Sequence, residues 1–239
     1  MVTRSLASGT GDAARELLGR LPLFHGLPPK ALEEVVRNVR LRGFSRGTVI
    51  FHKDDPGNQL YVILKGAVSI TLASEDGKDL VLSILSAGDF FGELSLIDEQ
   101  PRSASAVAVD DDTQTLILPR EAFLEPLMKY PQMALQITTL LSRRLREADA
   151  LAQDSALLDL PGRLARRLLE LGERHGRREG DRIRINLRLT QSELASLIGA
   201  TRVATNRQLQ RFQQQGVLSW QAQHITLLKP AVLRKLGLL

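Results

Sequence analysis

The stretch FGELSLIDEQPRSASAVA, residues 91–108, lies within a long run of short strand-like segments. These segments are rich in β-branched residues and extend from Leu41 to Leu118, and turn-forming pairs such as Lys65-Gly66 separate them. They are TVIF (48–51), LYVIL (60–64), VSITL (68–72), LVLSIL (80–85), SASAVAV (103–109) and TLIL (115–118). Many short strands at near-regular spacing predict an all-β roll or barrel.

The same stretch carries polar residues that suit a small anionic ligand. A cyclic phosphodiester has a negative charge shared by its free oxygens, which an arginine fork and a nearby hydroxyl can satisfy, and Arg102 and Ser103 supply such a pair. Glu93 could accept a hydrogen bond from a ribose hydroxyl and pair with the free edge of the arginine. Gly92 has no side chain, so the backbone at this position can lie close to the ligand. Taken alone, however, this spacing indicates only a surface salt bridge.

Helices are expected on both sides of the strand region. Residues 12–20 and 28–39 predict short helices, and the Leu/Ala/Arg-rich stretch 133–158 predicts a long one. Within the long helix, residues recur at steps of four and three, which is typical of a seam between two paired helices. They are Ile137, Leu141, Leu145, Ala148, Ala152 and Ser155. This seam predicts a homodimer, and the alternative is a helix that lies on its own roll.

A change of pattern follows the long helix. Pro161-Gly162 is expected to break the chain, and residues 163–174 then predict another helix. A loop around Gly176 and Gly180 is expected to lead into a short strand over residues 182–187.

The segment after this strand predicts a helix-turn-helix. Thr190 and Glu193 have the spacing of a capping box, which places a helix start before residues 193–199. A second helix is expected between the cap Thr201 and Gly216, and two helices joined at a glycine form a helix-turn-helix. The alternating runs 217–220 and 224–228 then resemble the strands of a wing. The alternative is a helical hairpin that only caps a domain.

The second helix has a face rich in hydrogen-bond donors. Val203, Leu209 and Phe212 suit the core, whereas the residues expected to point outward are Arg202, Thr205, Asn206, Gln208, Gln210 and Arg211. Such a face suits base edges and phosphates. The candidate DNA-binding residues are Thr190, Thr201, Arg202, Val203, Thr205, Asn206, Arg207 and Arg211.

The charge of the chain is unevenly distributed. Of its 32 Lys/Arg and 27 Asp/Glu, residues 161–239 hold 15 and 5, which gives this part a net charge of +10. Residues 1–160 hold the remaining 17 and 22, which gives −5. A basic segment that also has a folded pattern favours neutralisation of nucleic-acid phosphates.

Several classes of function are disfavoured by composition. The chain has no cysteine, so disulfides, thiolate nucleophiles and cysteine-bound iron–sulfur clusters are excluded. No apolar run approaches about 20 residues and the start of the chain lacks the apolar core of a signal peptide, so a cytoplasmic protein with no membrane contact is expected. The four histidines are dispersed, and no metal-ligand cluster, matched haem-ligand pair or catalytic triad stands out. We therefore expect no enzyme and no metal site.

Over nearly its whole length the chain resembles the CRP/FNR superfamily of transcription regulators. Three segments carry the resemblance in the order of the family: FGELSLIDEQPRSASAVA, SRRLREADAL…LLDLPGRLARRLLEL and LTQSELASLIGATR. The resemblance implies an α+β fold with an N-terminal antiparallel, jelly-roll-like β-roll that binds a cyclic nucleotide. A long dimerisation helix and a C-terminal winged helix-turn-helix would follow it. The expected divisions are 1–20 (leader and short helix), 21–130 (roll), 131–160 (dimerisation helix) and 161–239 (DNA-binding domain).

The resemblance also implies roles for residues of the ligand site. In the cyclic-AMP-responsive members the glutamate holds the ribose hydroxyl and the arginine and serine hold the cyclic phosphate, and Glu93, Arg102 and Ser103 match them. A Thr-Ser pair contacts adenine in those members, but Ala148-Asp149 stands at that place here. The candidate ligand-binding residues are Gly92, Glu93, Leu94, Arg102, Ser103, Ala104, Ala148 and Asp149.

The exchanged pair leaves the base of the effector open. An aspartate accepts hydrogen bonds without donating any, so Asp149 suits the N1–H and N2–H₂ of guanine. Cyclic GMP is therefore expected as an effector beside cyclic AMP, with cyclic di-GMP or no ligand at all as alternatives. Asp149 could instead pair with Arg146 or Arg143.

The recognition helix also departs from the family, where Arg-Glu-Thr-Val followed by Gly-Arg is common and this chain has residues 202–207, RVATNR. Arg202 and Arg207 match the arginines that read guanines or phosphates, whereas Val203 replaces a glutamate that accepts from cytosine. The expected partner is a palindromic double-stranded operator that differs from the common half-site of the family. A homodimer would bind it, and RNA polymerase is a further expected partner if the protein activates transcription.

Overall fold

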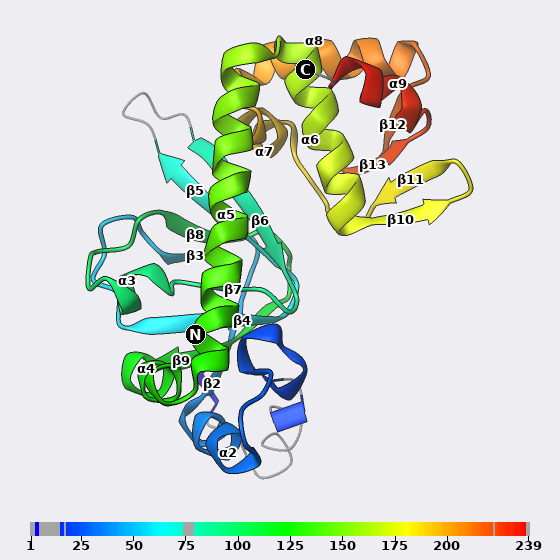
Figure 1. Ribbon diagram of the computed structural model, residues 1–239. Coiled ribbons are helices and arrows are strands. Elements are labelled where there is room, and N and C mark those ends of the chain that lie inside the picture. The colour runs from blue at the N-terminus through cyan, green and yellow to red at the C-terminus, as the bar shows by residue number, and fades with distance from the viewer. Residues whose placement is uncertain (1–2, 5–14, 17, 74–78, 222, 238–239) are drawn as a thin grey trace. The chain divides into compact units, whose positions relative to one another are not determined.

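The computed structural model describes residues 3–4, 15–16, 18–73, 79–221 and 223–237 (Figure 1). The chain divides into two compact units. The first comprises Met1–Leu72 and Ser83–Arg146, and the second comprises Ala73–Leu82 and Glu147–Leu239. The expected α+β fold, with antiparallel sheets first, then a long helix and a helix-turn-helix, is confirmed.

The N-terminal unit contains two antiparallel sheets. One has the strand order β1-β2-β9-β4-β7 and the other the order β3-β8-β5-β6. Their strands are β1 (Thr3–Arg4), β2 (Arg40–Phe44), β3 (Val49–Phe51), β4 (Gln59–Lys65), β5 (Ala67–Ala73), β6 (Asp79–Ser86), β7 (Phe90–Phe91), β8 (Ser105–Ala108) and β9 (Thr113–Pro119). Side chains from both sheets, including Ile63, Val68 and Phe91, form a buried cluster. The six strand-like runs of the sequence are all strands, and β1, β2 and β7 are additional ones.

Helices cover one side of this unit. They are η1 (Pro22–Phe24), α2 (Pro29–Asn38), α3 (Leu94–Ile97), α4 (Arg120–Lys129) and the part of α5 (Pro131–Leu157) that ends at Arg146. Val35 of α2, Phe123 of α4 and Met133 of α5 are buried in one cluster with Leu116 and Leu118 of β9. Of the expected helix 12–20, residues 15, 16 and 18–20 are helical, and 12–14 and 17 lie outside the described residues. Helix α4 was not among the expected helices.

The C-terminal unit packs helices on one face of a small sheet. Its elements are α6 (Leu160–His175), β10 (Gly176–Glu179), β11 (Arg182–Ile185), α7 (Gln191–Leu197), α8 (Arg202–Gln214), β12 (Leu218–Gln221), β13 (His224–Leu227) and α9 (Pro230–Leu236). The sheet has the order β10-β11-β13-β12. A Cβ on Gly172 of α6 would lie 3.2 Å from both Ile183 and Leu227, so α6 covers the apolar face of the sheet. Trp220 of β12 is half-buried and pairs with Ile225.

Two expectations for this unit are wrong. Pro161-Gly162 does not break the chain, because the side chain of Asp159 accepts a hydrogen bond from Gly162 N and caps a helix that begins at Leu160. Proline is compatible with that first turn, where its missing N–H is no loss. The segment Gly176–Glu179 is a strand rather than a loop, since it pairs with β11 over its whole length.

Candidate functional site

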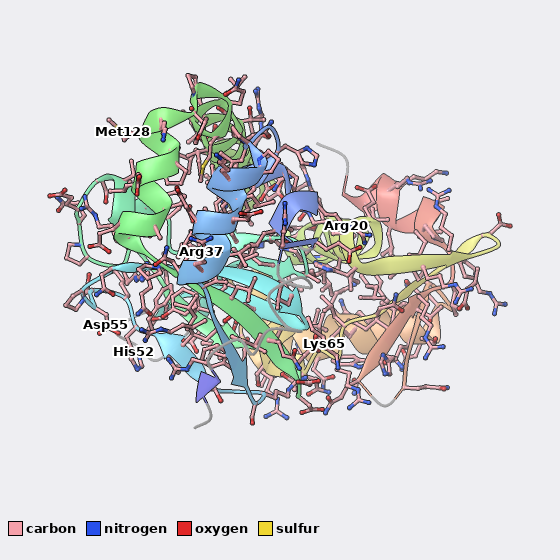
Figure 2. All side chains as sticks on the ribbon, turned by 90° about the horizontal axis from the view of Figure 1, so that it is seen from below. Arg20, Arg37, His52, Asp55, Lys65 and Met128 are labelled. Atoms are coloured by element: carbon pink, nitrogen blue, oxygen red, sulfur yellow. The ribbon has the colours of Figure 1, made fainter. Side chains whose placement is uncertain are left out.

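Arg102 is buried in the loop between α3 and β8, with 4% of its surface exposed. Its Nη1 donates to Gly92 O at 2.7 Å and to Ser95 Oγ at 2.8 Å, and its Nη2 donates to Gln59 O at 2.7 Å. Its backbone N–H donates to Asp55 O at 2.9 Å. Figure 2 labels His52 and Asp55, which belong to the loop that contains this acceptor oxygen. Within the loop, the backbone N–H of His52 donates a hydrogen bond to Asp55 Oδ2. The guanidinium is therefore held in one orientation by backbone and side chains.

Aromatic rings complete the surroundings of Arg102. The guanidinium carbon lies 4.3 Å from the centre of the Phe51 ring and 5.9 Å from that of Tyr61, and Tyr61 stacks on Phe91. Burial lowers the pKa of Arg102, and the nearby Tyr61, Glu93 and Asp55 act in the opposite direction. Since a guanidinium effectively keeps its proton in proteins, Arg102 carries a positive charge at pH 7. Burial likewise raises the pKa of Tyr61.

One edge of the guanidinium is left for a ligand. Arginine has five N–H donors, and three bonds to Gly92, Ser95 and Gln59 leave Nε–H and one N–H of Nη2, which share an edge of the planar group. Arg102 Nε is buried and makes no hydrogen bond with any described residue. A planar edge with two parallel N–H groups matches two oxygens of a phosphate.

Two glycines allow the chain to approach Arg102. Gly92 has a φ of +85°, and a Cβ there would lie 2.6 Å from Arg102 Nη1. A Cβ on Gly57 would lie 2.2 Å from Ser95 Oγ and 2.9 Å from Arg102 Nε. Any larger residue at either position would displace the guanidinium or the serine that holds it.

Glu93 lies directly before α3 and is 1% exposed. Its carboxylate forms an ion pair with Arg144 of α5, which also donates to Phe90 O. Glu93 thus pairs with Arg144 in the structure, and its expected pairing with the free edge of Arg102 in the presence of a ligand stays a prediction. Three hydrogen bonds already fix the Arg102 Nη atoms toward Gly92, Ser95 and Gln59, whereas Arg144 reaches Glu93 from the helix.

The remaining expected ligand residues occupy varied surroundings. Ala104 is buried. Leu94 directly follows the buried Glu93 in the chain, Ser103 directly follows the buried Arg102, and both Leu94 and Ser103 are exposed. Ala148 and Asp149 are exposed on α5. Within the part of the chain that the structure describes, Asp149 has no ion pair with Arg143 or Arg146. The structure thus brings Gly92, Glu93 and Arg102 together in one site.

Sequence reasoning missed several residues that build this site. They are Phe51, Gly57, Gln59, Tyr61, Ser95 and Arg144. Gly57 lies in the run DPGN (55–58), whose residue types indicate only a turn, and Gln59 contributes a backbone oxygen that no residue type reveals. Arg144 is one of three arginines within residues 143–146, and the sequence offered no reason to single it out.

Only part of the expected seam on α5 is available to a partner. Ile137 is buried in the core of its own roll, so the expectation that it faces a second helix is wrong, whereas Leu141 packs against the same cluster and is only partly buried. Leu145 is 64% exposed, and Ala148 and Ala152 are also exposed. The residues at this spacing therefore pack on the roll at the start of the helix, whereas those further along the helix lie on an exposed face.

The helix-turn-helix begins as expected. The Thr190 side chain accepts from Glu193 N, and the Glu193 carboxylate accepts from Thr190 N, which completes the capping box of α7. Thr201 caps α8 by accepting from Ala204 N. Gln191 of α7 donates to Asn206 Oδ1 at 3.0 Å, so the two helices are joined by side chains as well as by their turn.

The rotation of α8 differs from the expectation. Thr205, Gln208, Leu209 and Phe212 form its buried stripe, at the spacing of an inward helix face. Thr205 donates to Thr201 O and is fully buried, so the expected outward orientation of Thr205 and Gln208 is wrong. Val203, expected in the core, is 71% exposed. The exposed face carries Arg202, Val203, Arg207, Gln210 and Arg211, with Asn206 at its margin.

Known families match both units. The cyclic nucleotide-binding domain family matches residues 41–130, and the Crp-like helix-turn-helix domain family matches residues 162–236. Together with the buried arginine site and the exposed face of α8, these matches define a class of protein. The chain is a ligand-responsive, DNA-binding transcription regulator.

Relatives identify the family more closely. The chain is 35% identical over 201 residues to a CRP-like cAMP-activated global transcriptional regulator of Mycobacterium tuberculosis, covering 84% of this chain and 89% of the relative. It is 36% identical over 197 residues to the cyclic AMP receptor protein of Thermus thermophilus, covering 82% and 88%. The solved structure of the c-di-GMP-responsive global regulator CLP of Xanthomonas campestris is similar with a TM-score of 0.72 at 25% identity, covering 84% of this chain and 99% of that chain.

The chain belongs to the CRP/FNR family. These relatives are transcription regulators and not enzymes. Among the residues that the structure describes, no helix is both long and apolar enough to span a membrane.

Proposed function

We propose that this regulator is a homodimer gated by a cyclic mononucleotide, cyclic AMP or cyclic GMP, that binds at Arg102. The observation that supports this proposal most is the buried guanidinium of Arg102. Its Nη atoms are fixed by Gly92, Ser95 and Gln59, whereas its Nε has no hydrogen-bond partner among the described residues. A buried donor without a partner costs about 1–3 kcal/mol, and an anionic ligand removes that cost. The Ser103 hydroxyl, next in sequence and exposed, would donate to the second phosphate oxygen.

Glu93 would accept the ribose 2′-hydroxyl. Its carboxylate is already oriented by Arg144 of α5. Arg144 engages Glu93 Oε1, whereas Oε2 is buried and has no hydrogen-bond partner among the described residues, so a ribose hydroxyl would donate to Oε2 and weaken the hold of the carboxylate on Arg144. The ligand would thereby act on α5 and bias the chain between two states, because only differential affinity for two states transmits a signal.

Dimerisation would use the exposed face of α5, including Leu145, Ala148 and Ala152. Two α8 helices related by a two-fold axis would fit successive major grooves about 34–36 Å apart, so the operator would be palindromic. Arg202, Arg207 and Arg211 would contact DNA from the exposed face of α8. RNA polymerase would be a further partner if the protein activates transcription.

Asp149 would select the base. It is exposed on α5 and forms no ion pair with a described residue, so its carboxylate can accept hydrogen bonds from the N1–H and N2–H₂ of guanine.

Two relatives bear names that refer to cyclic AMP, whereas the similar structure of CLP is described as responding to c-di-GMP. Cyclic di-GMP is therefore the second candidate effector.

A calorimetric titration tests the proposal. The full chain would be titrated with cyclic AMP, cyclic GMP and cyclic di-GMP, and one of the two mononucleotides should bind well below a Kd of about 1 mM. Binding of cyclic di-GMP alone would establish the second candidate. Absence of binding by all three would refute a cyclic-nucleotide effector.

A further inference from the structure

The sheet of the C-terminal unit has a polar face that none of the functions above uses. Arg177 of β10 pairs with Arg184 of β11, Arg184 with Thr226 of β13, and Thr226 with Ser219 of β12. Residues directly opposite in an antiparallel sheet point to the same side. These four residues therefore form one row across all four strands, which we call the Arg177–Ser219 row.

The row lies on the side of the sheet opposite to α6. The neighbouring residues Ile183, Ile185, Ile225 and Leu227 are buried, whereas Arg177 and Arg184 are exposed. Since α6 packs against Ile183 and Leu227, the arginines point away from it. The row is thus an open surface of guanidinium and hydroxyl groups, the donors that commonly bind nucleic-acid phosphates.

The charge of the row is not balanced within the protein. Like charges directly opposite on neighbouring strands destabilise a sheet, and Arg177 and Arg184 are such a pair. Neither they nor Arg182 forms an ion pair or side-chain hydrogen bond with any described residue, although Glu179 stands opposite Arg182. An external anion would relieve this repulsion, and a polyanion would relieve it along the row.

The row starts on the strand that follows the helix-turn-helix in the chain. Strand β12, which carries Ser219, begins at Leu218, shortly after α8 ends at Gln214, and β10 is the opposite edge of the sheet (Figure 1). Four strands are separated by three spacings of about 4.8 Å, so the row of hydrogen-bond donors is about 14 Å long from β12 to β10. That length equals about four base pairs at about 3.4 Å each.

We propose that the Arg177–Ser219 row binds the phosphate backbone of DNA beside the base pairs that α8 contacts. It adds affinity without reading sequence, because phosphates are the same for every base. The proposal rests on the DNA-binding activity of the family and is independent of which effector binds at Arg102.

The test is the salt dependence of DNA binding by the full chain and by the double variant Arg177→Ala/Arg184→Ala. Low salt is used, where charge alone supports binding to random-sequence DNA. On a duplex of about 40 base pairs, each lost contact should reduce the slope of log K against log salt by about 0.9. The affinity should fall by the same factor for every sequence. On a duplex too short to extend beyond α8, the double variant should match the wild type.

Arg178→Ala is the matched control, because Arg178 is exposed on the same strand but pairs with the inward Ile183. Its slope should equal that of the wild type, and the double variant should melt no lower than the wild type since a repulsion is removed. Equal slopes for the wild type and the double variant would overturn the proposal. Equal losses in the double variant and the control would overturn it as a general charge effect. A wild type that bound no duplex would instead refute the DNA-binding function itself.

Discussion

The two units differ in how they present arginine side chains to negatively charged ligands. In the N-terminal unit a single arginine, Arg102, is buried, held by three hydrogen bonds and covered by the Phe51 ring. In the C-terminal unit the arginines of α8 and of the hairpin β10–β11 are exposed. A buried, fixed donor suits one small anion of defined shape, and many exposed donors suit a long polyanion.

This difference predicts opposite responses to salt. Interactions between exposed charges are screened over about 10 Å at 0.1 M salt, whereas buried pairs are screened much less. Effector binding at Arg102 should thus change little with salt, whereas DNA binding should weaken steeply.

Arg102→Leu should have the largest effect. Removal of the guanidinium leaves the ligand phosphate without its charge partner and should weaken effector binding by about 2–5 kcal/mol. Calorimetry measures the loss, and circular dichroism checks the fold. Arg37→Leu, at an exposed position on α2, is the control and should bind as the wild type does. Unchanged affinity in a folded Arg102→Leu variant would contradict the assignment of the phosphate site.

Substitution of Arg202 or Arg207 should have the next largest effect. If the exposed side chain contacts a base edge, its loss should reduce discrimination against the wrong base by about 1–3 kcal/mol. If it contacts only phosphate, affinity should fall equally for all sequences. Competition between operator and mismatched duplexes distinguishes the two cases for Arg202→Ala and Arg207→Ala. No change in either variant would show that this face of α8 does not meet DNA.

Val203→Glu should sharpen the preferred operator at one base pair of each half-site. Val203 is exposed beside Arg202, and a glutamate there could accept a hydrogen bond from cytosine. Selection of binding sites from random duplexes should return a relaxed palindrome for the wild type and a narrower one for the variant. Identical site preferences would mean that position 203 lies outside the groove.

Asp149→Ala tests base selection and should have a smaller effect. Loss of one acceptor should weaken cyclic GMP by about 1–3 kcal/mol, because only guanine offers an N1–H at that edge. Cyclic AMP should be affected less. Titration of both nucleotides measures the difference, and equal losses would argue against a contact between Asp149 and the base.

Asp112→Asn should have the smallest effect. Hydrogen bonds from Lys65 and Gln114 lower the pKa of Asp112, whose side chain is exposed. A carboxylate with a lowered pKa stabilises the fold above its ordinary pKa, and the contribution disappears as the pH falls through the lowered value. The melting temperatures of wild type and variant should therefore differ slightly at neutral pH and converge in acid. A difference that persists in acid would assign the effect to something other than this charge.

Patterns in the sequence predicted the elements better than their orientation. The strands and the capped helices follow from alternation and from capping residues, which act locally. The rotation of α8 was wrong because its buried stripe contains Thr205 and Gln208, whose polarity resembles that of an exposed face. Helix α4 was missed because Pro126 interrupts its pattern, and β10 because its residues GRRE are mostly charged.

The ligand site shows the same limit. Gly92, Glu93 and Arg102 could be identified because their types carry the chemistry. The partner of Glu93 could not, since the choice of Arg144 over Arg143 depends on the rotation of α5. Ile137 was misassigned because the same spacing serves a helix packed on its own roll and a helix packed on a partner.

The position of Trp220 gives each unit its own optical signal. It is the one tryptophan of the chain and lies in β12, whereas both tyrosines, Tyr61 and Tyr130, belong to the N-terminal unit. Excitation at the red edge of the absorption band therefore reports on the DNA-binding unit alone. Tyrosine emission reports on the other unit, where Tyr61 lies beside Arg102. The unmodified chain can thus reveal, without any attached dye, which unit responds first to an effector.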